Sequence, residues 1–247
     1  MIVPHWSCSR FMAWDICPGE YRARYVLERP VIVTEALAFG QAMHHALESH
    51  YTGQDGERAF RHFWREEQLH VDGGVSPRLT STGLRLLDQV FELGLHGTPE
   101  RGFEIDTNAD LLAPIVGAID LSDDTSGTVF DFKTTQGRWS QDRAQTEVWQ
   151  PLIYTWAEWE RTSQLFDFEY VVMDRSRGTV SRFRREHWSP DQWLAQMNVA
   201  WLRMQFIAAH VRADQFDCPG QHGFCPECGG RWSHDHECDT LPRRIRL

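Results

Sequence analysis

Residues 114–134 read PIVGAIDLSDDTSGTVFDFKT, and this stretch carries most of the information about the fold. It predicts two strands, PIVGAIDL and TVFDFKT, joined by the polar turn SDDTSG. Side chains two residues apart in a strand share a face, so Asp131 and Lys133 point together while Phe130 and Phe132 point away. Charged groups such as these and Asp120 are costly among apolar neighbours unless they pair or bind a metal. The hairpin therefore indicates a functional site as well as a fold.

The composition fits one moderately large domain, or a core with appendages. The chain has 247 residues, of which 41% are hydrophobic, enough for a substantial core. A net charge of −10 argues against a broadly basic surface for nucleic acid, although a local basic groove is compatible with it. Arginines gather in three clusters, each of which is either a solvated surface or a contact for a polyanion: Arg22, Arg24 and Arg29; Arg175, Arg177, Arg182, Arg184 and Arg185; and Arg243, Arg244 and Arg246.

Nothing in the sequence predicts a membrane protein. No apolar run is long enough to span a bilayer, and the opening MIVPHWSCSRF lacks the pattern of a signal peptide. We therefore expect a cytoplasmic protein with no membrane partner. In that compartment the six cysteines are better interpreted as thiols or metal ligands than as disulfides.

Helical and strand patterns alternate along the rest of the chain. Helices are predicted at 36–51, 57–69, 79–95, 144–161 and 190–210, and Pro151 implies a kink or a restart in the fourth of them. A strand is predicted at 103–106, and a second hairpin at 167–186 turns at 175–178. These patterns predict an α/β fold with a mixed central sheet of four or five strands flanked by helices. They also predict a helical N-terminal arm and a Cys-rich C-terminal segment that pack beside each other.

The charged residues of the hairpin are suited to metal chemistry. Carboxylates on adjacent strands can share one Mg²⁺ or Mn²⁺, hard cations that also bind phosphate. With a lysine beside such an ion, Asp120, Asp131 and Lys133 have the groups needed for hydrolysis of a phosphodiester. The alternative is an exposed strand face carrying an ion pair.

Several motifs in order resemble the PD-(D/E)XK nuclease superfamily, in particular RecB-like exonucleases and the CRISPR-associated iron–sulfur exonucleases. Asp120 with Asp131-Phe132-Lys133 resembles the signature itself, and Ile119 stands where the first motif often has proline. Three further motifs resemble the same group: Phe39-Gly40-x-x-x-His44-x-x-Leu47-Glu48, Gln150-x-x-x-Tyr154, and Cys17-Pro18-x-x-Tyr21-x-x-Arg24-Tyr25. Glu104 stands where the group often has a glutamate before the hairpin.

The resemblance implies a restriction-endonuclease-like core and roles for each motif. Asp120, Asp131, His44 and the backbone carbonyl of Phe132 would bind the metal, and Lys133 would act on the water or the phosphate. Gln150 and Tyr154 would position the DNA strand. Glu48 is interpreted as a residue behind the site or on the helix face. The implied division is a helical region at 1–100, a nuclease core at 101–190 and a C-terminal helix with a cysteine segment at 191–247, in one integrated domain.

The cysteines suggest a second metal centre. In the iron–sulfur members, one N-terminal cysteine joins three near the C-terminus around a four-iron cluster, which implies Cys17, Cys225, Cys228 and Cys238 here. The gap between Cys228 and Cys238 is longer than in that family. Zinc is the rival, bound by Cys218, Cys225, Cys228 and Cys238, or with His234 or His236 replacing one of them.

The function that follows is a metal-dependent DNA exonuclease acting on single strands or free ends in recombination or repair. The alternative is a non-catalytic module that holds zinc or an iron–sulfur cluster and docks on DNA or on a recombination partner. Assembly into a homo-oligomer is compatible with either hypothesis.

Overall fold

The computed structural model describes residues 3–30, 33–71 and 74–216. Its contacts divide the chain into two compact units. The terminal unit contains residues 3–30, 104–117 and 191–216, and the central unit contains 33–71, 74–103 and 118–190. The central unit carries the predicted hairpin.

Five strands form one mixed sheet in the order β1-β2-β3-β4-β5, as the sequence predicts. Their bounds are β1 Thr98–Ile105, β2 Ile115–Asp123, β3 Thr128–Thr135, β4 Asp167–Asp174 and β5 Thr179–Arg184. The pairs β2–β3 and β4–β5 are antiparallel, whereas β3 and β4 are parallel. Both predicted hairpins are confirmed.

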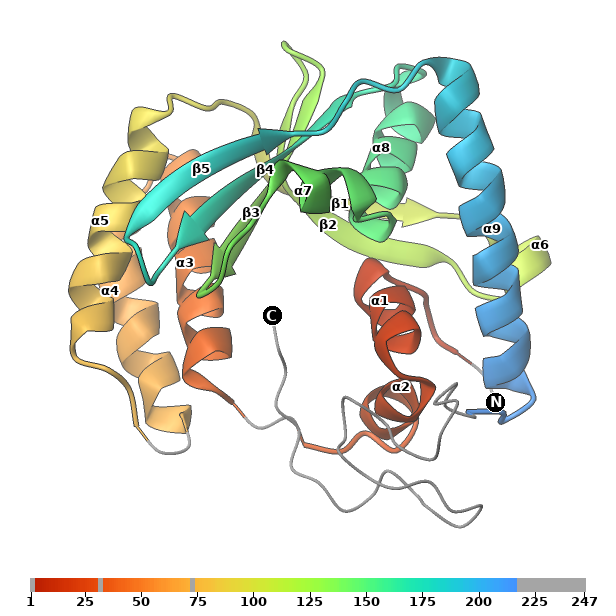
Figure 1. Ribbon diagram of the computed structural model, residues 1–247, viewed down its shortest axis with the longest axis horizontal. Coiled ribbons are helices and arrows are strands. Elements are labelled where there is room, and N and C mark those ends of the chain that lie inside the picture. Colours follow the sequence, from red (N-terminus) through yellow and green to blue (C-terminus); the bar gives the residue numbers. More distant parts are fainter. Residues whose placement is uncertain (1–2, 31–32, 72–73, 217–247) are drawn as a thin grey trace. The chain divides into compact units, whose positions relative to one another are not determined.

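Three helices cover one face of β3, β4 and β5 in the central unit (Figure 1). They are α3 Glu35–Tyr51, α4 Gly56–Glu67 and α5 Arg78–Glu92, with the short 3₁₀ helix η1 Gln68–His70 after α4. Phe130 and Phe132 belong to the apolar core between this face and the helices. Gly40 lets α3 approach β3 closely, because a Cβ there would lie 3.2 Å from Oγ1 of Thr134. That approach brings His44, one helical turn later, to the sheet.

The connection from β3 to β4 contains two helices where the sequence predicts one. Helix α7 spans Gln141–Thr146 and α8 spans Trp149–Thr162. The break falls just before Pro151, so the proline occupies the first turn of α8, where its missing N–H costs no hydrogen bond. The predicted interruption is confirmed as a restart, and it lies at residues 147–148, shortly before Pro151.

A buried ion network ties α8 to β1 and β2. The carboxylate of Glu158 is 1% exposed and accepts hydrogen bonds from Ser122 Oγ at 2.6 Å and Arg161 Nε at 2.8 Å. Arg101 Nη1 donates to the same carboxylate at 3.2 Å and to Asp124 at 2.7 Å. A buried charge with this many partners is compensated, and it fixes the position of Arg101 in β1.

The terminal unit joins the two ends of the chain. It contains α1 Cys8–Ile16, α2 Pro18–Tyr25, α6 Asn108–Leu111 and most of α9 Pro190–Arg212. The backbone of Trp6 bridges to Ile115, Asp15 accepts hydrogen bonds from Arg203 at 2.8 and 3.0 Å, and Trp14 packs edge-on to His210. Chain-distant segments therefore share one small core.

Two predictions are not tested by the described residues. Cys218, Cys225, Cys228 and Cys238, with His234 and His236, lie outside them, so their role and the packing of their segment stay predictions. The division at residues 100 and 190 into parts of one integrated domain also stays a prediction. Across the described ranges, no helix is both long and apolar enough to cross a bilayer.

Candidate metal and nuclease site

The site begins where the β2–β3 ladder ends. The register pairs Leu121 with Phe130 and Ser122 with Val129, so one further step would set Asp120 opposite Asp131. Instead of continuing the ladder, Oδ2 of Asp120 accepts a hydrogen bond from the backbone N–H of Phe132 at 2.7 Å. The two acids of the hairpin are thus brought to one place, as the sequence predicts.

Asp131 is fully buried and lacks conventional hydrogen-bond partners. Its exposure is 0%, and neither carboxylate oxygen has a hydrogen-bond partner among the described residues, although Lys133 Nζ lies 2.7 Å from Oδ2 as an ion pair. Burial raises the pKa of Asp131 from 3.8 to about 6; repulsion from Asp120 adds to this, while Lys133 and His44 oppose it. A buried acid of this kind is typical of a functional site.

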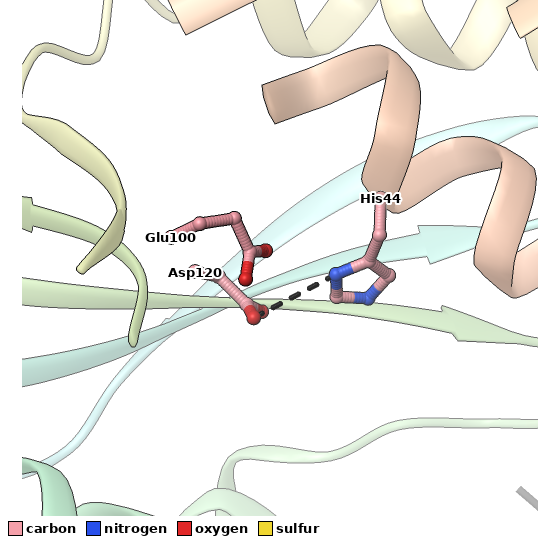
Figure 2. A group of neighbouring side chains, drawn as sticks. All are labelled: His44, Glu100 and Asp120. Carbon is pink, nitrogen blue, oxygen red and sulfur yellow. Dashed lines mark ion pairs between the residues drawn. The ribbon is translucent and has the colours of Figure 1, made fainter. Parts of the chain in front are cut away.

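Three ligand-type side chains converge beside the hairpin (Figure 2). One ligand atom from each of His44, Glu100 and Asp120 lies within 4.8 Å of the other two. His44 Nδ1, from α3, lies 3.6 Å from Oδ1 of Asp120. The two oxygens of Asp120 therefore have different partners, one on β3 and the other on α3.

Glu100 is the residue that sequence reasoning missed. The sequence points to Glu104, but the glutamate in this group is Glu100. Alternation along β1 places both glutamates on one exposed face, so periodicity alone does not separate them. The backbone does: Glu100 has a φ of +44°, in the left-handed region that favours glycine, whereas Glu104 is not among the residues of positive φ.

The environment of Glu100 also marks it. Burial raises the pKa of its carboxyl group to about 6, and the negative charges of Asp120 and Glu48 raise it further, while His44 lowers it. Glu48 itself is exposed on α3 and lies 3.7 Å from His45 Nδ1, which agrees with its predicted place on the helix face. A cation in this group would relieve the repulsion among the acids.

Gln150 and Tyr154 lie one turn apart on α8, as their spacing predicts. Gln150 is half-buried, and Tyr154 is 7% exposed with its ring near Phe103 and Phe168, at centroid distances of 5.8 and 6.4 Å. In this position Tyr154 packs between α8 and the sheet. The DNA-positioning role of the pair stays a prediction, as does metal binding by the carbonyl of Phe132.

The residues present fit a divalent cation. The donor set of two carboxylates and one imidazole nitrogen combines oxygen ligands of the kind that Mg²⁺ and Mn²⁺ prefer with one histidine. Oδ1 of Asp131 is a further buried oxygen without a hydrogen-bond partner among the described residues, whereas Oδ2 faces the ammonium of Lys133. A buried oxygen such as Oδ1 is costly unless a cation or a proton reaches it.

Comparison with known families decides the class of protein. Residues 5–233 match the model of the PD-(D/E)XK nuclease superfamily, which is most of the chain. The chain belongs to this superfamily. The predicted resemblance to the PD-(D/E)XK nucleases is confirmed at the level of the superfamily. The assignment of Asp120 and of Asp131-Phe132-Lys133 to the signature that names it stays a prediction.

A solved structure supports the same fold. The crystal structure of a candidate exonuclease from Eubacterium rectale aligns with a TM-score of 0.61 over 87% of this chain and 84% of that chain, at 11% identity. The predicted restriction-endonuclease-like α/β fold of a PD-(D/E)XK nuclease is therefore confirmed. A search of curated proteins found no match.

Proposed function

We propose that the protein is a metal-dependent DNA exonuclease that acts on single strands or on free ends. The observation that carries this proposal is the convergence of His44, Glu100 and Asp120 in the unit that also holds the buried Asp131 and its ion-pair partner Lys133. This arrangement combines a candidate cation site with a basic side chain of the same hairpin. The neighbour from Eubacterium rectale, described as a candidate exonuclease, supports the choice of exonuclease.

His44, Glu100, Asp120 and Asp131 would hold the cation, with the carbonyl of Phe132 as a further ligand. A bound Mg²⁺ or Mn²⁺ would polarise the phosphoryl oxygen and lower the pKa of a bound water.

The chain's own groups then have defined tasks. Asp131 holds the ammonium of Lys133 at 2.7 Å, and Lys133 donates hydrogen bonds to the negative charge that grows on the phosphate. The hydrogen bond from the backbone N–H of Phe132 orients the Asp120 carboxylate through Oδ2. Oδ1 of the same carboxylate faces Nδ1 of His44. Gln150 and Tyr154 hold the strand in line with these groups, Tyr154 chiefly by bracing the sheet from α8.

We also propose that Cys17, Cys225, Cys228 and Cys238 bind a four-iron cluster, with zinc as the rival metal and Cys218 as the alternate ligand. Cys17 is 2% exposed at the start of α2, and its carbonyl oxygen accepts a hydrogen bond from the backbone N–H of Tyr21. Phe216, two residues before Cys218, stacks on Tyr21 at a centroid distance of 6.1 Å. Iron and zinc analysis with an absorption spectrum, on anaerobically purified protein, separates the two metals.

The test of the nuclease proposal compares linear with circular single-stranded DNA in the presence of Mn²⁺ or Mg²⁺. An exonuclease degrades the linear strand and leaves the circle intact. Asp131→Asn and Lys133→Gln should each abolish degradation, whereas Asp142→Asn, an exposed acid on α7, should not. Wild-type protein that binds DNA but never cleaves it with any divalent cation would refute the proposal.

A further inference from the structure

The three arginine clusters of the sequence have different fates. In the cluster on β4 and β5, four of the five arginines pair with carboxylates: Arg175 with Glu35, Arg177 with Asp174, Arg182 with Glu169 and Arg184 with Asp167. The fifth, Arg185, is buried and donates to the carbonyl oxygens of Ala144 and Glu147. This cluster is neutralised within the fold. The cluster at 243–246 lies outside the described residues.

The arginines of α1 and α2 are different. Arg10, Arg22 and Arg24 have no carboxylate within ion-pair distance in the part of the chain that the structure describes, and all three remain partly exposed to solvent. The ion pair between Asp15 and Arg203 in the terminal unit does not include them. In a chain of net charge −10, Arg10, Arg22 and Arg24 outnumber Glu20, the acid of α2, and give these two adjacent short helices a local positive surface.

Aromatic rings hold these guanidinium groups in place. Arg10 and Arg24 lie over the ring of Tyr25 at 4.4 and 5.1 Å, and Arg22 lies over Phe216 at 5.9 Å. Stacking uses the flat face of a guanidinium group and leaves its N–H donors free at the edge. The fork of donors is then preorganised for a planar or tetrahedral anion.

The charge of Arg10 also changes the pKa values of two neighbouring side chains, His5 and Tyr21. Burial lowers the pKa of His5, and the charge of Arg10 lowers it further. Burial raises the pKa of Tyr21, and Arg10 opposes that rise. Both effects show that the charge of Arg10 acts on the side chains next to it.

We propose that Arg10, Arg22 and Arg24, with Tyr25 and Phe216, form an arginine face that binds the phosphate backbone of single-stranded DNA. The proposal rests on the proposed function, since it assigns a strand-holding surface to the nuclease that lies apart in sequence from its catalytic residues. Phosphodiesters match the geometry of the stacked guanidinium edges, and the three arginines outnumber Glu20, the acid of α2. The arginine face acts on affinity for the strand and leaves the chemistry of the nuclease site unchanged.

The experiment uses the triple variant R10Q/R22Q/R24Q of the full chain. Its matched control is R58Q/R65Q/R78Q, which removes three exposed arginines from α4 and α5 and changes the net charge equally. Binding of fluorescent oligothymidylate is followed by anisotropy without added divalent cation, at several salt concentrations. Each phosphate contact to a single strand contributes about 0.7 to the slope of log K against log salt, so the triple variant should lose about 2 and the control nothing.

Hydrolysis of the p-nitrophenyl ester of thymidine 5′-monophosphate, with Mn²⁺, is the second readout. This substrate has one phosphodiester and no strand for the arginine face to bind, so the triple variant should hydrolyse it at the wild-type rate. If wild type hydrolyses neither this ester nor DNA, the proposed function fails, while a lost salt slope still supports the arginine face. If the triple variant keeps the affinity and slope of the control, the arginine face is refuted.

A structural role would have a different signature. The single variant R22Q tests for such a role. If it loses helical circular dichroism, or bound iron or zinc, the arginines serve the fold or the cysteine centre, and the proposal is overturned. Arg24→Lys retains the charge but not the fork. It should recover most of the salt slope that Arg24→Gln loses, and equal loss in both would contradict the electrostatic argument.

Discussion

Replacing Asp131 by asparagine should stabilise the protein while it abolishes catalysis. The carboxyl group is 0% exposed, and its pKa is raised from 3.8 to about 6. Each pKa unit corresponds to about 1.4 kcal/mol, so the ionised carboxylate costs the folded protein about 3 kcal/mol at neutral pH. Asparagine has nearly the same shape but carries no charge. Because its amide also needs partners in this buried place, we expect a net gain of about 1–3 kcal/mol.

The sign of the pH dependence follows from the raised pKa. The folded protein holds the proton of Asp131 more tightly than the unfolded chain does. The stability that this group contributes is fully present below pH 4 and is lost as the pH rises through about 6. Asparagine does not titrate, so the stability difference between Asp131→Asn and wild type should grow between pH 5 and pH 7.5.

Denaturant unfolding without divalent cations, at these two pH values, measures the effect. For a chain of this size, 1–3 kcal/mol also corresponds to a rise of about 2–12 °C in the thermal midpoint. Asp142→Asn, on the exposed surface of α7, is the control and should change neither quantity. A variant that is no more stable than wild type at pH 7.5, or a difference that is the same at both pH values, would refute the reasoning.

Two further predictions concern β1. Glu100→Gln should weaken Mn²⁺ binding about 10–100-fold, because one of the two carboxylates leaves the group of three. The affinity is measured by calorimetry and from the Mn²⁺ dependence of cleavage. Glu104→Gln is the matched control, and equal effects of the two substitutions would contradict the assignment of Glu100. Arg101→Met should destabilise the protein by about 3 kcal/mol in denaturant unfolding, since it removes a partner of the buried Glu158. Arg161→Met, on the same carboxylate but more exposed, should cost about 1 kcal/mol, and the reverse order would show that the network is wrongly interpreted.

The hairpin and its acids could be predicted because the information is local. Strand alternation around Asp131 and Lys133, with a polar turn behind them, needs no knowledge of the rest of the chain. The place of His44 on a helix was also local, through its one-turn spacing from Gly40. The meeting of that helix with the hairpin came from the family resemblance and not from periodicity.

What could not be predicted depends on backbone conformation and on distant partners. The left-handed φ of Glu100 singles it out from Glu104, and no residue pattern encodes that conformation. The sequence also did not predict which arginines form ion pairs, because Arg182 and Arg184 pair with Glu169 and Asp167 on the neighbouring strand. The break between α7 and α8 lies at Glu147, whose backbone is extended, and α8 begins at Trp149, two residues before Pro151. The helical pattern of the sequence continues through this point and does not show where the chain leaves the helix.

The terminal unit constrains how the chain can be synthesised. Asp15 binds Arg203 across 188 residues, and Trp14 packs against His210 of the same helix. At about 5–20 residues per second, the ribosome needs about 10–40 s to supply α9 after α1 has emerged. During that time Trp14, which is buried in the finished protein, lacks the helix that carries His210. The core of α1 and α2 is therefore incomplete until α9 has been synthesised, and until then its apolar side chains are open to aggregation or proteolysis.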